Sequence, residues 1–162
     1  GDIKIEMASD MPITTGNFVK LVKEGFYDGT RFHRVIGPAK APPNGFMIQG
    51  GDPLSKDLSK SNSWGTGSPG YAIKDEFVPG LSNVRGTLAM ANSGPNSGGS
   101  QFFINLQDNS FLDYNKPPMQ SKHPVFGTVV SGMDVVEKIA LVKTDGGDKP
   151  LKEVVIVKAT VE

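Results

Sequence analysis

Residues 92–106 read NSGPNSGGSQFFINL, and this stretch decides how the chain folds. Turn-forming residues lead directly into a run rich in apolar side chains. Neighbouring side chains of a β-strand point to opposite faces of the sheet. Phe102 and Ile104 therefore share one face, which we assign to the core, and Gln101 and Phe103 share the other. An aromatic ring beside an amide on the outward face predicts a binding surface.

Short alternating segments separated by glycine and proline predict a mainly β domain. The expected strands are 2–7, 31–36, 45–51, 86–91, 100–106, 124–130 and 153–161. Two segments, 14–24 and 133–142, have helical periodicity instead; Thr14 or Thr15 would cap the first, and Gly25 follows its end. Many strands with two short helices predict a closed sheet whose open ends the helices cover.

The alternation can be followed through three of the expected strands. Val35, Ile48, Phe102 and Ile104 fall on one face, which would fill the interior. The opposite face would carry an apolar floor, one permanent cation and two amides, namely Met47, Phe103, Arg34, Gln49 and Gln101. An outer wall of this kind suits an uncharged peptide, because the floor takes a side chain while the amides and the guanidinium bind its backbone.

Taken one at a time, several of these residues have ordinary structural explanations. Arg34 fits a surface ion pair, and Met47 fits simple packing. His33 is expected to form a hydrogen bond within the fold, whereas His123, just before a proline and a strand, fits either a structural or a binding role. Trp64, in a loop, fits a half-buried anchor or a contact at the rim of the groove. The combination of residues on one face is what favours a binding site.

The composition excludes several classes of function. Lysine plus arginine equals aspartate plus glutamate at 17 each, which leaves no electrostatic footprint for nucleic acid or an anionic membrane. The chain has no cysteine and two histidines outside any metal-ligand spacing, so neither a thiolate nor a metal chemistry is indicated. GTGSPG (65–70) lacks the lysine of a phosphate loop, and GGSQ (98–101) lacks the nucleophile-turn pattern. We expect a cytoplasmic monomer without a membrane partner.

Four segments carry a family resemblance: FHRVI (32–36), GFMIQGGDP (45–53), RGTLAMANSGPNSGGSQFFINL (85–106) and HPVFGTVVSGMDVVEKI (123–139). They resemble the cyclophilins, the peptidyl-prolyl cis–trans isomerases, in order and over nearly the whole chain. The resemblance implies one isomerase domain over residues 1–162. It also implies an eight-stranded antiparallel β-barrel capped by two α-helices, with the active groove on its outer wall and with neither cofactor nor metal.

The resemblance also assigns roles to individual residues. It makes Arg34 the catalytic arginine and places Gln49 among the residues that hold the peptide backbone; in the mechanism that such a site allows, Gln49 would also orient Arg34. The proline pocket would consist of Phe46, Met47, Phe103 and Leu112, with Phe111 beside it and His123 at its rim. Ala91, Asn92 and Gln101 would hold the peptide backbone and the residue before the proline, and Gly65 would lie near a neighbouring pocket. The implied partners are proline-containing peptides and unfolded proteins, and the implied role is assistance in protein folding.

The chain departs from the family pattern in three places. Phe111 stands where many eukaryotic members have a tryptophan that helps to bind cyclosporin, so weakened binding of that drug is expected. Segments 37–44 and 114–121 are insertions that flank the groove. The first segment of the chain, GDIKIEM, resembles the second strand of the family, so the usual first strand is expected to be missing from these residues. The alternative to an active isomerase is a module that binds proline-containing peptides with little turnover.

Overall fold

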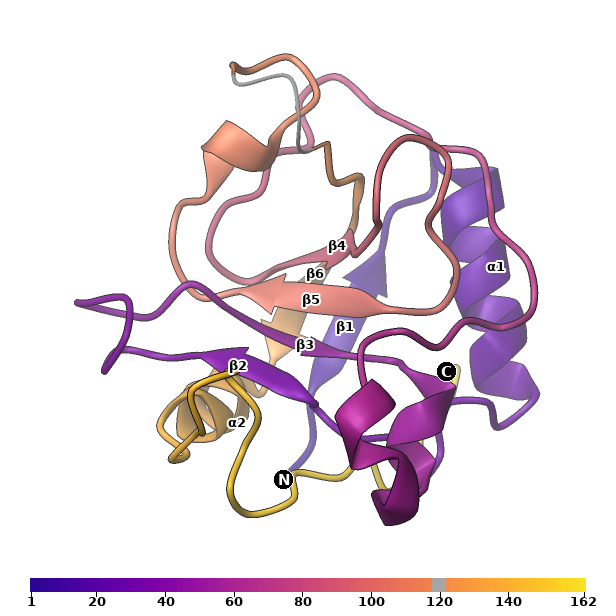
Figure 1. Ribbon diagram of the computed structural model, residues 1–162. Coiled ribbons are helices and arrows are strands. Elements are labelled where there is room, and N and C mark those ends of the chain that lie inside the picture. The colour runs from indigo at the N-terminus through magenta and orange to yellow at the C-terminus, as the bar shows by residue number, and fades with distance from the viewer. Residues whose placement is uncertain (118–121) are drawn as a thin grey trace.

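A computed structural model of the protein describes residues 1–117 and 122–162. Among these residues, six strands form one antiparallel sheet in the order β1-β6-β4-β5-β3-β2 (Figure 1). The strands are β1 (Lys4–Met7), β2 (Arg34–Ile36), β3 (Met47–Gly50), β4 (Thr87–Met90), β5 (Phe102–Asn105) and β6 (Val125–Ser131). The first five lie within expected strand segments, and β6 extends one residue past its expected segment, so the mainly β prediction is confirmed.

The closed eight-stranded barrel is not confirmed, because hydrogen bonds within the described residues do not join the two edges of the sheet, β1 and β2. The prediction of a strand at 153–161 is wrong, because this segment is not one of the six strands of the sheet. That segment forms one isolated bridge, from Val155 to Arg31, and a few backbone hydrogen bonds to the loop after the first helix. The Phe32 amide donates to the Val154 carbonyl at 2.9 Å, and the Ile156 amide donates to the Thr30 carbonyl at 2.8 Å. The segment is therefore partnered but does not form a ladder.

Helix α1 (Pro12–Lys23) begins at Pro12, whereas the sequence predicts a start at Thr14, and it has a different cap. Pro12 occupies the first helical position, where its missing N–H costs no hydrogen bond. The Glu76 carboxylate accepts from the amides of Ile13 (3.2 Å) and Thr14 (2.6 Å). A distant loop therefore satisfies the free amides at the helix start, and the prediction of a threonine cap is wrong.

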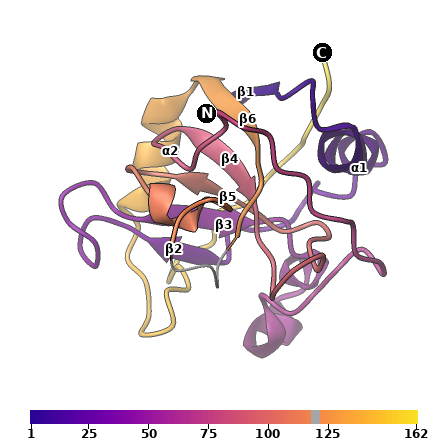
Figure 2. The ribbon, with the colours of Figure 1, turned by 90° about the horizontal axis from the view of Figure 1, so that it is seen from above.

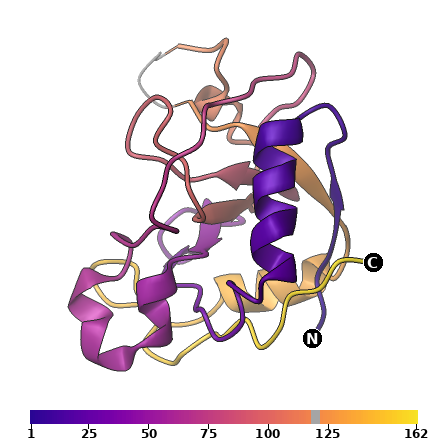
Figure 3. The same ribbon diagram turned by 90° about the vertical axis from the view of Figure 1, so that its right-hand side faces the viewer.

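Helix α2 (Met133–Ala140) lies at the opposite end of the curved sheet from α1, as Figure 2 shows from above. Both helices nevertheless contribute to one apolar cluster, α1 through Leu21 and Val22 and α2 through Val136 and Ala140. In Figure 3, α1 stands in front of the sheet and the two ends of the chain lie near each other; Lys4 and Glu162 form an ion pair there. The two predicted helices are confirmed.

The alternation along the strands separates two apolar clusters, as the sequence predicts. The inner cluster contains Val35, Ile48, Phe102 and Ile104, together with residues of both helices. The second cluster lies on the outer face of the sheet and consists of Met47, Ala89, Phe103, Leu112 and Val125. Three short 3₁₀ helices complete the described elements: η1 (Pro53–Lys56), η2 (Leu58–Ser63) and η3 (Ser110–Leu112). The outer cluster is the floor of the candidate site.

Candidate functional site

One row of residues crosses the outer face of the sheet. Arg34 on β2 pairs with Gln49 on β3, Gln49 pairs with Phe103 on β5, and Phe103 pairs with Ala89 on β4. Adjacent strands lie about 4.8 Å apart, so the Cα atoms of Arg34 and Phe103, two strands apart, are separated by about 10 Å. The structure therefore brings together the cation, the amide and the aromatic ring that the sequence placed on one face.

The apolar floor is packed rather than open. Met47 and Phe103 point away from the inner core, as expected, yet they are only 2% and 5% exposed. Phe46 packs against this outer cluster, and its ring stacks on that of Phe111 with centroids 6.0 Å apart. Leu112 is buried in the same cluster. The four residues of the expected proline pocket thus lie together, and they form a small second core beneath the surface.

Ala89 and Val125 also belong to this floor, and the sequence reasoning missed both. Strand alternation contains the signal that could have found them. Ala89 has the same parity as Ala91, and Val125 has opposite parity to Phe126, which lies in the inner cluster. The small side chain of Ala89 occupies the row between Phe103 and Val125. A larger residue there would fill the space above its neighbours.

An amide network holds one end of the groove. The Gln49 side-chain amide donates to Oε1 of Gln101 at 3.0 Å. Nε2 of Gln101 donates in turn to the carbonyl of Gly65 at 3.0 Å and to that of Gly67 at 2.9 Å. Gln49 was expected to orient Arg34, but its side-chain amide is directed to Gln101 instead. The network ties β3 and β5 to the glycine loop.

Asp52, which follows β3, fixes that glycine loop from below. It is fully buried, and its carboxylate accepts from the amides of Gly65, Gly67 and Leu54. A Cβ at position 67 would lie 2.0 Å from Oδ1 of Asp52, so only glycine fits there. The GGD sequence at 50–52 was quoted above as part of a family motif; its aspartate proves to be the anchor of the loop.

The opposite rim of the groove contains His123 and Asn92. Nδ1 of His123 lies 2.9 Å from the Met90 carbonyl, which can only accept, so Nδ1 carries the proton. Burial lowers the pKa of His123, which favours the neutral ring, and the edge of that ring contacts Phe103 at a centroid distance of 5.3 Å. The Asn92 amide donates to the Lys122 carbonyl at 2.7 Å, so its side chain stabilises the rim itself. Ala91 lies beside them and donates its backbone amide to the Gln101 carbonyl at 3.0 Å.

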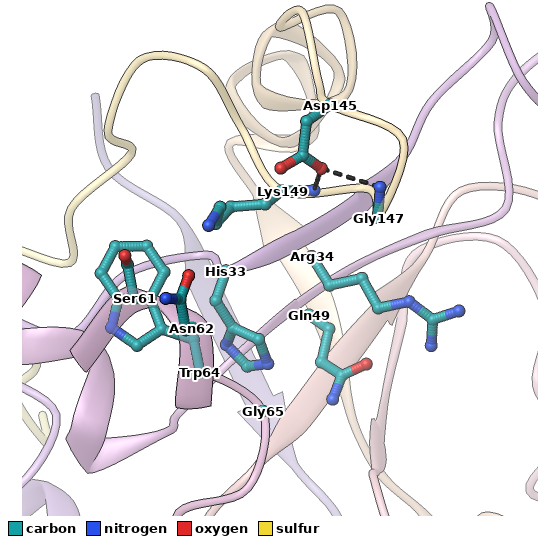
Figure 4. Close-up of a pocket in the computed structure, with 10 residues that line it drawn as sticks. All are labelled: His33, Arg34, Gln49, Ser61, Asn62, Trp64, Gly65, Asp145, Gly147 and Lys149. Carbon is teal, nitrogen blue, oxygen red and sulfur yellow. Dashed lines mark hydrogen bonds between the residues drawn. The ribbon is translucent and has the colours of Figure 1, made fainter.

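Arg34 has a partner that the sequence did not indicate. Its Nε lies 3.5 Å from Oδ2 of Asp148, and Nζ of Lys40 lies 2.7 Å from the other oxygen of the same carboxylate. Lys40 belongs to the inserted segment 37–44, which thus contacts the loop after α2. The Arg34 side chain is 48% exposed, and Figure 4 shows its guanidinium directed away from His33. No local pattern could link Arg34 to a residue 114 positions away.

His33 does not behave as expected. It is 5% exposed, and within the described part of the chain neither ring nitrogen forms a hydrogen bond of acceptable geometry, although Gln101 lies close to it. Burial lowers the pKa of His33, and the nearby Asp52 carboxylate only partly opposes this. Trp64 has a feature of each of its two expected roles. Its indole Nε1 donates to the Asp57 carbonyl at 3.1 Å, which anchors the loop, and its ring lines a hollow beside Arg34.

Neither a metal centre nor a membrane-spanning helix is found in residues 1–117 and 122–162. No group of three or more histidine, cysteine or acidic side chains there is arranged to hold a metal ion. The helices in these ranges are too short or too polar to cross a bilayer. Residues 118–121 of the inserted segment 114–121 lie outside the described residues.

Known proteins are similar in sequence to this chain across its length. The family model described as cyclophilin type peptidyl-prolyl cis-trans isomerase/CLD matches residues 1–161. The peptidyl-prolyl cis-trans isomerase-like 1 of Gibberella zeae is 43% identical over 163 residues, which cover 99% of this chain and 89% of that protein. The peptidyl-prolyl cis-trans isomerase ppi1 of Schizosaccharomyces pombe is 42% identical over 161 residues, which cover 98% and 92%.

A solved structure shares the fold. The cyclophilin type peptidyl-prolyl cis-trans isomerase of Cryptosporidium parvum, crystallised in the presence of the dipeptide Ala-Pro, matches with a TM-score of 0.81 at 31% identity. The match covers 100% of this chain and 93% of that chain. The chain described here therefore belongs to the cyclophilin-type peptidyl-prolyl cis–trans isomerases, which catalyse rotation about the peptide bond before proline.

Proposed function

We propose that the outer row Arg34–Gln49–Phe103 is the active groove in which this chain rotates X–Pro bonds. The observation that carries the proposal is the strand register, which sets a half-exposed guanidinium two strands from a buried aromatic floor. Unaided, the X–Pro bond isomerises over tens of seconds, against a barrier of about 18–20 kcal/mol. Reaching the millisecond range requires the removal of about 6 kcal/mol, at 1.36 kcal/mol for each factor of ten.

The apolar floor supplies part of the reduction in the isomerisation barrier, because it keeps water away from the bond. A planar amide owes its barrier to resonance, which places partial charges on oxygen and nitrogen. Twisting the bond removes this charge separation, so the twisted state depends less on hydration than the planar one. A proline ring held against Phe46, Met47, Phe103 and Leu112 is removed from water. The apolar surroundings therefore favour the twisted state relative to the planar state, and only such a difference raises the rate.

Arg34 lowers the barrier further by offering a polar interaction to the twisted bond. As resonance is lost, the proline nitrogen gains a lone pair that can accept a hydrogen bond. A charged donor contributes about 1.5–3 kcal/mol, and the guanidinium has several donors in one plane. The contact of Nε with Asp148 leaves the two terminal nitrogens of Arg34 available to the substrate, either at the proline nitrogen or at the proline carbonyl. No bond to the enzyme is formed, so the reaction requires no nucleophile.

The rest of the groove would hold one end of the peptide while the other end rotates. The Gln101 network fixes the glycine loop at Gly65, and the Ala91–Asn92 segment is tied to β5 and to Lys122. Nδ1 of His123 is occupied by the Met90 carbonyl, so Nε2 is left as an acceptor at the rim. These fixed groups give the peptide a rigid frame against which the X–Pro bond twists.

The partners follow from the groove. Its ligands would be proline-containing segments of unfolded proteins, which would bind to a monomer. Phe111 is 49% exposed at the edge of the floor and stacks on Phe46. It has no N–H donor, so cyclosporin is expected to bind weakly while isomerase activity is retained.

Two-dimensional NMR exchange on a short Ala-Pro peptide tests the proposal. Catalytic amounts of the protein should produce exchange cross-peaks between the cis and trans resonances, with a rate proportional to protein concentration. A module that binds without turnover would instead shift the peptide resonances at stoichiometric concentration and leave the exchange rate unchanged. That second result would contradict the proposed mechanism.

A further inference from the structure

A second hollow adjoins the proposed groove on the side away from the apolar floor. Its volume is about 390 Å³ (Figure 4). Arg34, Gln49 and Gly65 form the wall that it shares with the groove, and Asn62, Trp64 and Lys149 form its far side. The far side is built from the end of η2 and from the loop after α2, neither of which contributes to the proline pocket. One polypeptide that passes over Arg34 would therefore reach both spaces.

The hollow offers a ligand one cation that has no carboxylate partner in the described part of the chain. Arg34 pairs with Asp148, whereas Lys149 forms no ion pair within residues 1–117 and 122–162. Asp145 is the one carboxylate among its lining residues. Oδ1 of Asp145 accepts from the amides of Gly147 (2.9 Å) and Lys149 (3.0 Å), and these hydrogen bonds lower its pKa. Asp145 therefore serves the turn, while the Lys149 ammonium faces the space.

The walls are rigid where the ligand would lie. The indole of Trp64 is held by its hydrogen bond to the Asp57 carbonyl, and Nζ of Lys149 lies 5.7 Å from the ring centroid. The Asn62 side-chain amide makes no hydrogen bond with any described residue, and Figure 4 shows it beside Trp64. The buried ring of His33, whose nitrogens have no partner there, also lines the hollow. Free donors thus surround a space with a fixed aromatic wall.

We propose that this hollow binds the carboxylate side chain of an aspartate or glutamate close to the proline of the substrate. The Lys149 ammonium and the Asn62 amide would donate to the carboxylate, and the stem of the side chain would lie on Trp64. A cationic side chain would meet the like charge of Lys149, which has no acidic partner among the described residues, and a neutral amide would gain no charge-assisted hydrogen bond. The hollow thereby selects acidic substrates; this inference rests on the proposed function of the adjoining groove.

Matched peptides measure this selectivity. Blocked Ala-Pro peptides are prepared with glutamate or glutamine at the second residue before the proline and at the first and second residues after it. The rate of catalysed cis–trans exchange is compared within each pair at pH 7, where the glutamate is ionised. At one of these positions, the glutamate peptide should be favoured by about threefold at low salt, the size of a solvent-accessible ion pair. The preference should vanish at high ionic strength.

Two variants with the same change of charge locate the effect. Lys149→Gln should abolish the preference for glutamate, whereas Lys158→Gln, at an exposed position near the end of the chain, should retain it. Equal rates for every glutamate and glutamine pair in the unmodified protein would overturn the proposal. A preference that survives in Lys149→Gln would overturn it as well, because the carboxylate would then be recognised elsewhere.

A binding readout keeps this test separate from that of the isomerase mechanism. Trp64 is the only tryptophan, so its indole N–H gives one assignable NMR resonance. Titration with the glutamate peptide should shift that resonance at a lower concentration than titration with the glutamine peptide, whether or not turnover occurs. If the proposed mechanism fails, exchange is absent with every peptide but the indole shift remains. If the hollow does not bind the carboxylate, the two titrations coincide while exchange continues.

Discussion

The carboxylate of Asp148 lies 3.5 Å from Nε of Arg34 and 2.7 Å from Nζ of Lys40, so one acidic side chain bridges the proposed catalytic cation and an inserted segment. The Asp148 backbone also takes part, because its carbonyl accepts from the Val35 amide at 2.8 Å. The loop after α2 therefore docks on the free edge of β2. Arg34 belongs to this edge strand, and its guanidinium must be shared between Asp148 and a bound peptide.

Asp148→Asn is expected to raise kcat/KM modestly. An exposed ion pair is worth about 0–1 kcal/mol, which is less than the 1.5–3 kcal/mol of a charged hydrogen bond to the substrate. The resting contact therefore does not block the groove, and its removal should accelerate catalysis by about fivefold at most. Asparagine tolerates the positive φ of +68° at this position, so the turn should persist.

Lys40→Gln is the control for that variant, because it removes the second cation and leaves the Arg34–Asp148 contact in place. Its kcat/KM, measured by the same peptide exchange assay, should not increase. A fall of tenfold or more in Asp148→Asn would contradict this account and would make Asp148 a group that positions Arg34 for catalysis.

Phe103 and Phe102 are adjacent in sequence, equally buried and on opposite faces, so they offer a matched pair. Phe103→Leu should raise KM for an Ala-Pro peptide about tenfold, because a flat wall of the proline pocket is lost. Phe102→Leu should leave KM unchanged. Both should lower the free energy of unfolding by about 1 kcal/mol, measured by urea denaturation. Equal KM values in the two variants would remove Phe103 from the pocket.

The sequence alone was sufficient to predict which side chains share the outer face of the sheet. Alternation over three short strands predicted that Arg34, Gln49 and Phe103 share a face, because parity in a strand is local and needs no knowledge of the partner. The prediction of a strand at 153–161 was wrong for the complementary reason. An alternating pattern indicates an extended chain, but a ladder also requires a regular partner, and here residues 29–32 offer one bridge at Arg31 and three separate backbone hydrogen bonds.

Contacts between distant segments were not predictable from one sequence. The carboxylate that caps α1 comes from Glu76, 62 residues beyond Thr14, and no spacing rule connects them. Asp148 likewise reaches Arg34 only because the loop after α2 folds back over β2. His33 was expected to have a hydrogen-bond partner, but within the described residues its buried ring nitrogens have none.

Stability should fall as the pH is lowered below about 6.5. Burial lowers the pKa of both His33 and His123, whereas in the unfolded chain each would titrate near 6.5. Below that pH the unfolded state binds more protons than the folded state, so protonation favours unfolding. Urea denaturation between pH 7.5 and 5.5 measures this loss, and the two ring titrations can be followed by NMR. Folded-state rings that titrate at or above pH 6.5 would contradict the prediction.

Phe111→Trp should strengthen cyclosporin binding. The indole adds one hydrogen-bond donor at the exposed edge of the floor, worth about 1 kcal/mol or roughly fivefold in affinity. Isothermal titration calorimetry measures the change, and Phe111→Leu is the control that adds no donor. Exchange of an Ala-Pro peptide should be nearly unaltered in the tryptophan variant. An unchanged affinity for the drug would show that Phe111 does not limit it.

The role of Arg34 is tested most directly by the exchange rate of an Ala-Pro peptide with the Arg34→Ala variant. Arg85→Ala, which removes an exposed arginine that pairs with Glu137, is the control for charge, and thermal unfolding verifies that both variants fold. Loss of a charged hydrogen bond in the twisted state should reduce kcat/KM by about 10- to 100-fold in Arg34→Ala alone. A folded Arg34→Ala protein with full activity would contradict the proposed mechanism.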